Sequence, residues 1–575
     1  MLGKRGPQRG LFEADTMYGE HVGRDSFYGF LAAHRDELFR DGDFAGMYCP
    51  NNGRPSVPPS LLATALVLQT YDKVSDDEAH RRAAFDLQWK VALGVELTAV
   101  PFGKSTLCEF RALLLLHQQQ AAIFRKSLKL ARQRGYLKRQ KKLKVALDTT
   151  HILGRGAVVD TYNLLAEGIA LVVRALARQA GEAVETWAER AGYGRYITAS
   201  SLKGALAIDW DDKRQRQQAL ADIVADADRL LEQVRLARGL LADGGSEDAA
   251  LAEAASRLAR VLAQDITRKE AGPELRQGVA GDRMPAIHDP EVRHGRKSKS
   301  HRFVGHKAQV AVDTDSQFIT AVAVLPGNAP DAQQALEVVE QTEANTDCLV
   351  KETIGDCAYG SGATRQQFAD AGRTLIAKAP AVTNQGRFPK TQFSIDLEAR
   401  ACTCPAGQTT IALRGGKQPY FQFAPAVCGA CPLRPQCVRG QGGRTVQLHP
   451  QEALLQQARR FQASPPFREY QRRRQVVEHR LARLVQLGLR QGRYRGRAKT
   501  LFQLLMAAAV ANLTLLAGSI RRLVRLLGAY LAALLGLLVP PCDPLQRSSC
   551  PRRLASPALT LIPRTLKLAG SRPGF

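Results

Sequence analysis

A series of short runs of β-branched and apolar residues, interleaved with helical patterns, constrains the fold of this chain more than any other feature of its sequence. The runs occupy residues 141–150, 303–326, 348–355 and 374–382. The second contains two stretches separated by DTDSQ, which is the pattern of a β-hairpin. Helical patterns at 331–343 and 363–372 separate the later runs. This order predicts an α/β fold in which helices pack on a sheet.

Long helical patterns lie on both sides of the first run. Residues 25–138 predict an all-α N-terminal domain, because apolar residues recur at helical spacing with charges on the opposite face. Such a bundle suits DNA contact and a purely structural role equally. Residues 162–285 predict a helical insertion between the first strand and the hairpin. The chain of 575 residues is too long for one hydrophobic core, so several structural units are expected.

Three carboxylates occupy positions where such a sheet brings them together. Asp148 ends the first run, and Asp356 follows the third. Glu478 lies on an Arg-rich helical segment from Phe467 to about Arg490, at the border of an apolar stripe that should pack on the sheet. The stripe consists of Val477, Leu481, Leu484 and Gly488. Taken singly, the acids have other interpretations, namely a turn or cap residue, a flexible glycine-rich turn and a solvated, ion-paired helix face.

Carboxylates that meet in one place predict a metal site. Three of them within several ångströms repel one another unless cations neutralise them. Mg²⁺ or Mn²⁺ fits, because these ions take oxygen ligands and leave sites open for phosphate and water. Two such ions roughly 3.5–4 Å apart activate an attacking oxygen and stabilise the leaving one in a phosphoryl displacement. The sequence therefore predicts Asp148, Asp356 and Glu478 as the ligands of an enzyme that cleaves or transfers nucleic-acid strands.

The charge of the chain points to a polyanionic partner. The formal net charge is +27, which favours nucleic acid, although membrane-surface proteins and simply Arg-rich proteins share this property. On the Glu478 segment, Arg473 and Arg474 offer bidentate contacts to a DNA backbone. The first 25 residues contain no apolar stretch of the roughly 7–15 residues that a secretory signal needs, so export is not expected.

Five of the eleven cysteines are clustered between residues 402 and 437, and the total is odd, which favours metal ligation in a reducing compartment over a disulfide framework. The candidate ligands are Cys404, Cys428, Cys431 and Cys437, with Cys402 as a spare. They form one clean Cys-x₂-Cys knuckle in a turn-rich stretch, so the sequence predicts a structural zinc site. A reduced, metal-free loop and an iron–sulfur cluster would use the same residues.

One C-terminal stretch resembles a membrane span. Residues 501–520 carry no charge and reach the roughly 20 residues that a span requires. Polar residues interrupt the stretch, and the next apolar run, 526–539, is shorter and follows several arginines. We expect buried helices of a soluble domain; the competing interpretation is a basic-flanked membrane hairpin.

Several motifs, in this order, resemble the DDE transposases of bacterial insertion sequences in the cut-and-paste group. They are LDTTHILGRGAVVDTY, HKAQVAVDTDSQFITAVAVLPGNAPDA, IGDCAYGSG, and YQRRRQVVEHRLARL followed by GRYRGRAKTLFQLLMAAAVANL. The segment FYGFLAAHRDELFRDGDFAGMYCPNNGRPSVPPSLLATALVLQ also looks like the helical domain that precedes the catalytic fold in these enzymes. The resemblance covers roughly residues 25–520. By this likeness Asp148, Asp356 and Glu478 are the first, second and third acids.

The resemblance also implies an architecture. The fold would be α/β, a ribonuclease-H-like catalytic core with a long helical insertion and a cysteine-rich, zinc-ribbon-like insertion, preceded by the all-α domain. The expected units are a disordered N-terminus at 1–24, a DNA-binding domain at 25–138, a catalytic domain at 139–520 with insertions at 162–285 and 395–445, and a C-terminal helix with a basic disordered tail at 521–575.

The implied function is DNA transposition with Mg²⁺. The partners would be double-stranded DNA, as terminal inverted repeats and target, and a second copy of the chain on paired ends, in the bacterial cytoplasm at the nucleoid. Relatives carry a Tyr, an Arg, the Glu and a Lys at fixed steps; here Tyr470 stands eight residues before Glu478 and Val485 replaces the Lys. Arg483 and Lys499 are therefore the candidates for the last phosphate contact. The alternative is a transposase-derived DNA-binding protein that no longer cuts, although all three acids are present.

Overall fold

The computed structural model describes residues 1–6, 12–138, 142–156, 158–199, 201–240, 246–278, 280–298, 300–416 and 418–538. The chain divides into two compact units, residues 1–518 and 519–575. In the second unit the described residues are helical to Leu538, and Leu526 and Leu527 are exposed. The predicted basic tail after this helix lies outside the described residues.

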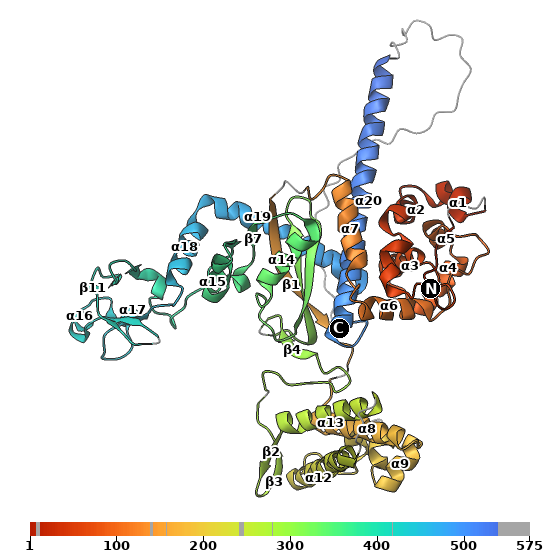
Figure 1. Cartoon of the computed structure of the whole chain (residues 1–575). Helices are drawn as coiled ribbons and strands as arrows, with labels where there is room; N and C mark the ends of the chain where they lie inside the picture. The colour runs from red at the N-terminus through yellow and green to blue at the C-terminus, as the bar shows by residue number, and fades with distance from the viewer. Residues whose placement is uncertain are drawn as a thin grey trace, which may run out of the picture. The chain divides into compact units, whose positions relative to one another are not determined.

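A mixed sheet forms the centre of the first unit (Figure 1). Its strands are β1 (Leu143–Leu153), β4 (Arg293–Arg296), β5 (Arg302–Asp313), β6 (Ile319–Pro326), β7 (Val350–Ile354) and β8 (Thr374–Ile376). Strand β5 pairs antiparallel with β1, β4 and β6, whereas β1 pairs in parallel with β7, and β7 with β8. The predicted hairpin of β5 and β6 is therefore confirmed. Strand β1, which carries Asp148, lies directly beside β7, the strand before Asp356.

Strand β1 is longer than the sequence predicted. Asp148 was expected to end the strand, but β1 continues to Leu153 because residues 149–153 pair with residues 309–305 of β5. Threonine and isoleucine favour this extended pairing. Asp148 consequently projects from the middle of β1, beyond the end of its parallel neighbour β7.

Helices cover the sheet as the sequence predicted. Helix α14 (Ala335–Thr346) contacts β5, β6 and β7 and lies over the sheet in Figure 1. Helix α15 (Gly362–Asp370) packs beside β8, and α19 (Pro465–Leu484) packs on β1, β5 and β7. The stripe residues Val477, Leu481 and Leu484 are buried.

The prediction for the fourth stripe residue, Gly488, was wrong. Helix α19 ends at Leu484, and a π-helical turn, η4 (Val485–Leu489), follows it. Gly488 adopts a φ of 91° there and is exposed, a conformation that glycine takes without steric cost. The chain kinks at this point and then runs beside the end of β1, where Leu153 N donates to Arg490 O at 2.9 Å and Gly492 N donates to Leu153 O at 2.8 Å.

The N-terminal region is helical. Its elements are α1 (Ala14–Val22), α2 (Phe27–Leu38), η1 (Asp41–Met47), α3 (Pro59–Asp72), α4 (Asp76–Phe85), α5 (Leu87–Leu93), α6 (Thr106–Leu116) and α7 (Ala122–Gln133). The expectation of a disordered N-terminus is wrong at α1, which is anchored where Ala14 N donates to Val95 O at 3.0 Å. Helix α3 contacts η4, and Arg493 Nη1 donates to Val74 O at 3.1 Å. These helices therefore pack directly on the segment that follows α19.

The predicted helical insertion forms a bundle with its own core. It contains α8 (Thr161–Gln179), α9 (Val184–Ala191), α10 (Gly194–Thr198), α11 (Leu202–Ala205), α12 (Lys213–Leu240) and α13 (Ser246–Asp265), followed by the hairpin of β2 (Ile266–Lys269) and β3 (Gly272–Leu275). Asp160 caps α8 by accepting hydrogen bonds from the backbone of Tyr162 and Asn163. The buried side chains of α8, α12 and α13 form one cluster, so the bundle has a core independent of the sheet.

Helix α20 (Arg497–Leu538) begins inside the first unit. Among the described residues, one helical segment, Arg497–Ile520, is long enough and apolar enough to cross a membrane. Most of this segment is buried within the protein. Asn512 is fully buried there, and its amide bonds both the N–H and the C=O of Ile319 in β6. A buried amide satisfied in this way is a feature of a packed core helix.

Candidate metal-binding site and cysteine module

Asp148 and Asp356 meet at one edge of the sheet. Ala146 is the partner of Ile354, the last residue of β7, and each acid stands two residues further along its chain. Since neighbouring strands lie about 4.8 Å apart, both carboxylates emerge at the same edge. Asp356 also caps the short turn η2 (Cys357–Tyr359), where its Oδ1 accepts from Ala358 N at 2.9 Å.

The turn that carries Asp356 is anchored by hydrogen bonds of Tyr359 and Arg365, two residues that the sequence analysis did not identify. The fully buried Tyr359 accepts a hydrogen bond at its hydroxyl from Gln309 Nε2, at 3.2 Å. Arg365 donates to the carbonyls of Gly360 and Ala377, at 3.1 and 2.6 Å. An aromatic residue inside the glycine-rich GDCAYGSG motif was the one signal that could have identified this anchor.

Glu478 reaches the same site from α19. Arg474, one turn earlier on the helix, donates from Nη1 to Asp148 Oδ2 at 3.1 Å and from Nη2 to Glu478 Oε1. The structure thus places the first and third predicted acids on a single guanidinium. Side-chain exposure is 17% for Arg474, 19% for Asp148 and 52% for Glu478, so Glu478 is the most solvent-accessible of these three side chains.

Mutual repulsion and burial both act on Asp148. The net pKa of its carboxyl is raised to about 6; burial is the largest cause, and Asp356 and Glu478 act in the same direction. The Thr149 N–H and Arg474 act in the opposite direction. Within the described residues no group of three or more His, Cys, Asp or Glu side chains is arranged so that it could hold a metal ion. The donor set is nonetheless of the hard-oxygen kind that Mg²⁺ prefers.

This raised pKa predicts a pH-dependent effect of Asp148→Asn on stability in metal-free buffer. An aspartate whose folded-state pKa is about 6, above its ordinary 3.8, contributes full stability below about pH 4 and loses it as the pH rises through 6. Asparagine has no such loss. At pH 7.5 we expect the unfolding free energy of the variant to exceed that of the wild type by on the order of 1–2 kcal/mol, and near pH 4 we expect the two to be equal. Urea unfolding in the presence of EDTA measures both. A difference that does not change with pH would contradict the assignment.

The other predicted phosphate contacts are distributed along the same region. Arg473 faces Glu469 and Asp315, at 3.1 and 3.6 Å, and Arg483 lies near Gln486. Lys499 is exposed in the first turn of α20. The described contacts do not join any of these three side chains to the acids.

The contacts of Tyr470 are not with the acids: its ring packs against Phe461 and beneath Lys144 Nζ. Burial raises the pKa of its hydroxyl, and a hydrogen bond to Glu352 raises it further. Arg490, which the sequence interpretation did not use, donates to Thr150 Oγ1 at 3.2 Å and to His151 O at 2.7 Å. It therefore places a cation beside β1 just beyond Asp148.

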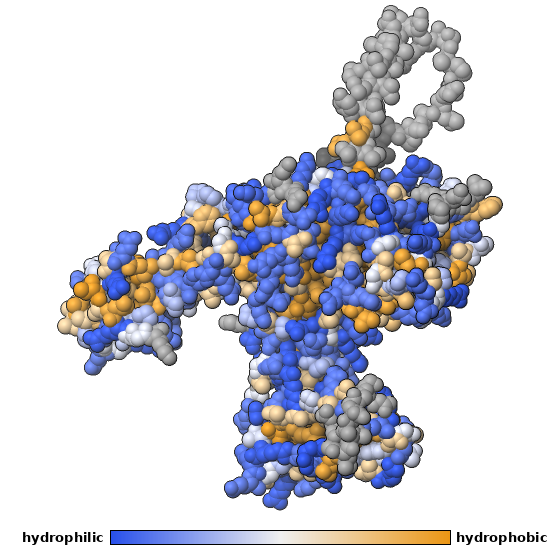
Figure 2. All heavy atoms as spheres, in the orientation of Figure 1, coloured by the Kyte–Doolittle hydropathy of each residue, from blue (hydrophilic) through white to orange (hydrophobic). Residues whose placement is uncertain are grey.

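The cysteine-rich region folds as a separate small module. It consists of β9 (Ser394–Asp396), β10 (Ala401–Thr403), β11 (Thr409–Thr410), β12 (Leu413–Arg414), β13 (Tyr420–Gln422), α16 (Pro425–Gly429), α17 (Arg434–Cys437) and β14 (Thr445–Gln447), and α18 (Glu452–Ala463) leads from it to α19. Figure 2 shows hydrophobic residues at the surface of this module. Ile411 and Val427 are exposed large hydrophobic side chains of the module.

The four predicted zinc ligands line one cavity of this module. They are Cys404, Cys428, Cys431 and Cys437. Burial raises the pKa of the Cys437 thiol, and the other three thiols raise it further. Arg444 N donates to Cys428 Sγ at 3.4 Å, a contact that would stabilise a thiolate. The spare, Cys402, is fully buried in the aromatic core of the module, where burial raises its pKa to about 11.

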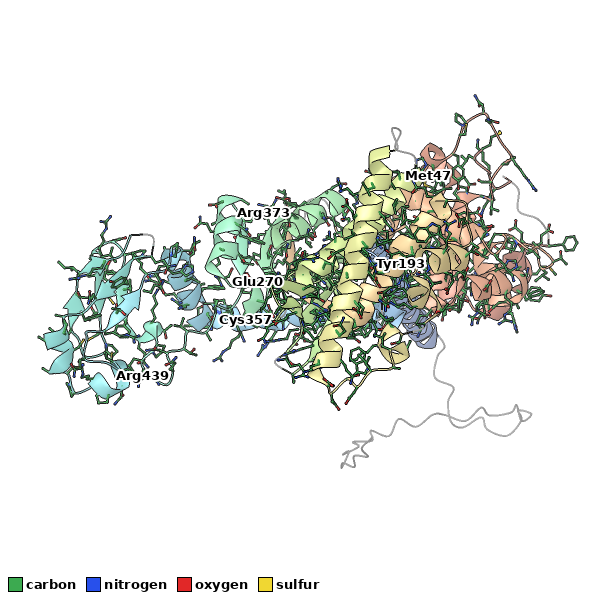
Figure 3. The ribbon with its side chains drawn as sticks, turned by 90° about the horizontal axis from the view of Figure 1, so that it is seen from below. Met47, Tyr193, Glu270, Cys357, Arg373 and Arg439 are labelled. Atoms are coloured by element: carbon green, nitrogen blue, oxygen red, sulfur yellow. The ribbon has the colours of Figure 1, made fainter. Side chains whose placement is uncertain are left out.

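Cys357, which directly follows Asp356, is not part of this cluster. Figure 3 labels it near the sheet, well apart from Arg439 of the cysteine module. Its thiol is exposed. The acids and the cysteines therefore form two distinct sites.

Two family models match separate segments of the chain. The family model of a transposase domain (DUF772) matches residues 17–113, and that of a transposase DDE domain matches residues 403–517. The second match includes Glu478 and the four clustered cysteines but neither Asp148 nor Asp356. No curated protein and no solved structure matches the chain. With two transposase segments in one chain, the function is that of a DDE transposase, a metal-dependent enzyme that cleaves DNA and transfers the cut strand.

Proposed function

We propose that Asp148, Asp356 and Glu478 are the three acids of this transposase, carried by a ribonuclease-H-like core. The observation that supports this best is the register of β1 and β7 together with Arg474, which connects Asp148 to Glu478 although 330 residues separate them in sequence. The strand order β6-β5-β1-β7-β8, with only β5 running against its neighbours β6 and β1, is the order expected for such a core.

Each residue of the proposed site has a role that its position supports. Two bound Mg²⁺ or Mn²⁺ would polarise the phosphate and activate the attacking oxygen. Asp148 and Asp356 supply carboxylate ligands from rigid positions at the sheet edge. Glu478 completes the set from a helix border that solvent and DNA can reach. Arg473, Arg483 and Lys499, which the described contacts leave outside the acid pocket, are proposed to hold the DNA backbone together with Arg474.

The DNA partners follow from the same proposal. We infer that the N-terminal helices bind the terminal inverted repeats of a cut-and-paste insertion sequence and that two copies of the chain act on paired ends, in the cytoplasm at the nucleoid. The net charge of +27 supports a large contact with phosphate. The direct packing of α3 on η4 supports communication between end binding and the segment after Glu478.

A strand-cleavage assay tests the proposed function. Full-length protein is incubated with a labelled duplex that carries the element's end, with Mg²⁺ or with EDTA, and with a scrambled duplex as control. We expect nicking at the end and strand transfer with Mg²⁺ alone. Metal-independent cleavage, or equal cleavage of the scrambled duplex, would reject the proposal.

We further propose a structural zinc ion in the cysteine module, held by the four thiols that line its cavity. Cysteine thiolates are the ligands of closed zinc sites, which stiffen a segment and perform no chemistry. The module links β8 to α18 and α19, so a stiffer module would fix the position of the helix that carries Glu478.

Metal analysis of two cysteine variants tests this site. Purified protein should contain about one zinc per chain, in line with a single four-thiolate site. Cys431→Ser should lose that zinc, whereas Cys402→Ser should keep it, because Cys402 points into the aromatic core. Stoichiometric zinc in Cys431→Ser would remove Cys431 from the ligand set, and zinc loss in both variants would show that the module simply unfolds.

A further inference from the structure

Arg474 holds a position between two of the proposed metal ligands. Its Nη1 binds Asp148 Oδ2, and its Nη2 binds Glu478 Oε1. The guanidinium is mostly buried, and its Nε lies in the interior without a hydrogen-bond partner. Two guanidinium nitrogens of Arg474, Nη1 and Nη2, therefore face the acids. The third nitrogen, Nε, makes no hydrogen bond that would fix the side chain elsewhere.

This contact has a direct consequence for cation binding. The guanidinium engages Asp148 Oδ2 and Glu478 Oε1, and its positive charge would repel a divalent cation placed beside these same two oxygens. A buried carboxylate without a counterion is also unfavourable, so a cation beside these ionised acids is stabilising. Arg474 and a divalent ion therefore compete for the same two oxygens.

The geometry of α19 permits this exchange. Arg474 and Glu478 stand at i and i+4 on one face of the helix, and the arginine side chain is long enough to turn toward solvent while the helix stays in place. Glu478 is half exposed, so the exit is open on that side. A guanidinium released there would meet the backbone of a bound DNA strand, for which its planar fork is well suited.

We propose that Arg474 is the exchangeable counterion of the acid pocket. In the metal-free protein it holds Asp148 and Glu478 together; when a divalent cation is bound, it gives up both contacts and its guanidinium becomes a phosphate ligand. This inference rests on the proposed function of the three acids, and it adds that DNA-free protein binds metal weakly because an internal cation competes for the site.

Manganese titration without DNA tests the exchange. Free Mn²⁺ is measured by electron paramagnetic resonance in the presence of full-length wild type, Arg474→Gln and Arg473→Gln. Arg473 is the matched control, because it stands on the same helix and its contacts are Glu469 and Asp315. We expect Arg474→Gln to bind Mn²⁺ roughly five- to tenfold more tightly than wild type, the scale of one partly buried ion pair. Arg473→Gln should stay within about twofold, as a rim charge would.

The other outcomes each overturn the inference. Unchanged affinity in Arg474→Gln would show that Arg474 does not compete, weaker affinity would show that it assembles the ligands, and equal tightening in both variants would reduce the effect to general charge. If circular dichroism shows that Arg474→Gln is unfolded, Arg474→Lys replaces it, with tightening of about two- to threefold expected because lysine lacks the fork. Mn²⁺ binding that is identical in wild type and Asp148→Asn would instead reject the proposed site itself.

Discussion

Replacing Asp148 with alanine, or Glu478 with glutamine, is expected to lower the rate of Mg²⁺-dependent cleavage at the element's end by roughly 1,000-fold or more. Each substitution removes one carboxylate from a site with three, and the loss of several kcal/mol of metal-supported stabilisation corresponds to this factor. Asp148 contributes its carboxylate from within β1 and Glu478 from the border of α19, so neither acid has a neighbour in sequence that can replace it. The measurement is the initial rate of nicking on a labelled end duplex.

Two controls separate lost chemistry from lost binding or folding. End binding in a gel-shift assay should remain within about threefold of wild type, because these acids contribute no phosphate contact. Glu469→Gln removes an exposed carboxylate from the same helix and should cleave like wild type. Cleavage at a normal rate in either Asp148→Ala or Glu478→Gln would refute the assignment of that acid.

Substitution of Gly360 by alanine is expected to lower the cleavage rate at least tenfold without changing any of the three acids. A Cβ at this position would lie 1.8 Å from the carbonyl oxygen of Lys378, which is backbone and cannot move aside easily. The turn from Asp356 to Gly360 would have to shift, and Arg365 would lose its bond to the Gly360 carbonyl. We expect a loss of about 3 kcal/mol in unfolding free energy and at least a tenfold loss in cleavage rate.

The matched control for this substitution is Gly19→Ala. Gly19 lies inside α1, and a Cβ there would meet nothing within 4 Å, so alanine should be neutral or stabilising by up to about 1 kcal/mol. Thermal unfolding followed by circular dichroism compares the two variants. A Gly360→Ala protein as stable and active as wild type would show that the turn does not need its close approach to residue 378.

The chain order of β1, β5, β6, β7 and β8 could be predicted from the sequence because each is a short apolar run bounded by turn residues or by a helical pattern, whereas β4 (Arg293–Arg296) is polar and was not predicted. The position of Glu478 followed from the same kind of signal, since the stripe of Val477, Leu481 and Leu484 fixes which face of the helix is buried. Whether the three acids share one metal site stays a prediction, because neither the family matches nor the coordinates test it.

The parts that could not be predicted depend on partners far away in sequence. Strand β1 continues past Asp148 because β5 pairs with it, and the helix kinks at Gly488 where α3 packs against the following turn. The anchoring of Tyr359 by Gln309 joins residues 50 positions apart, so no local pattern reveals it. Helix α1 is short and weakly amphipathic, and its order comes from a backbone bond to Val95 rather than from its own sequence.

The central claim is that three carboxylates distant in sequence bind the same divalent cations. The most direct test is an anomalous difference map from crystals of the full-length protein with its end duplex and Mn²⁺. The account predicts Mn²⁺ peaks within about 2–2.5 Å of carboxylate oxygens from Asp148, Asp356 and Glu478, with the Arg474 guanidinium moved away from both partners. Mn²⁺ bound elsewhere while Arg474 still bridges Asp148 and Glu478 would contradict it.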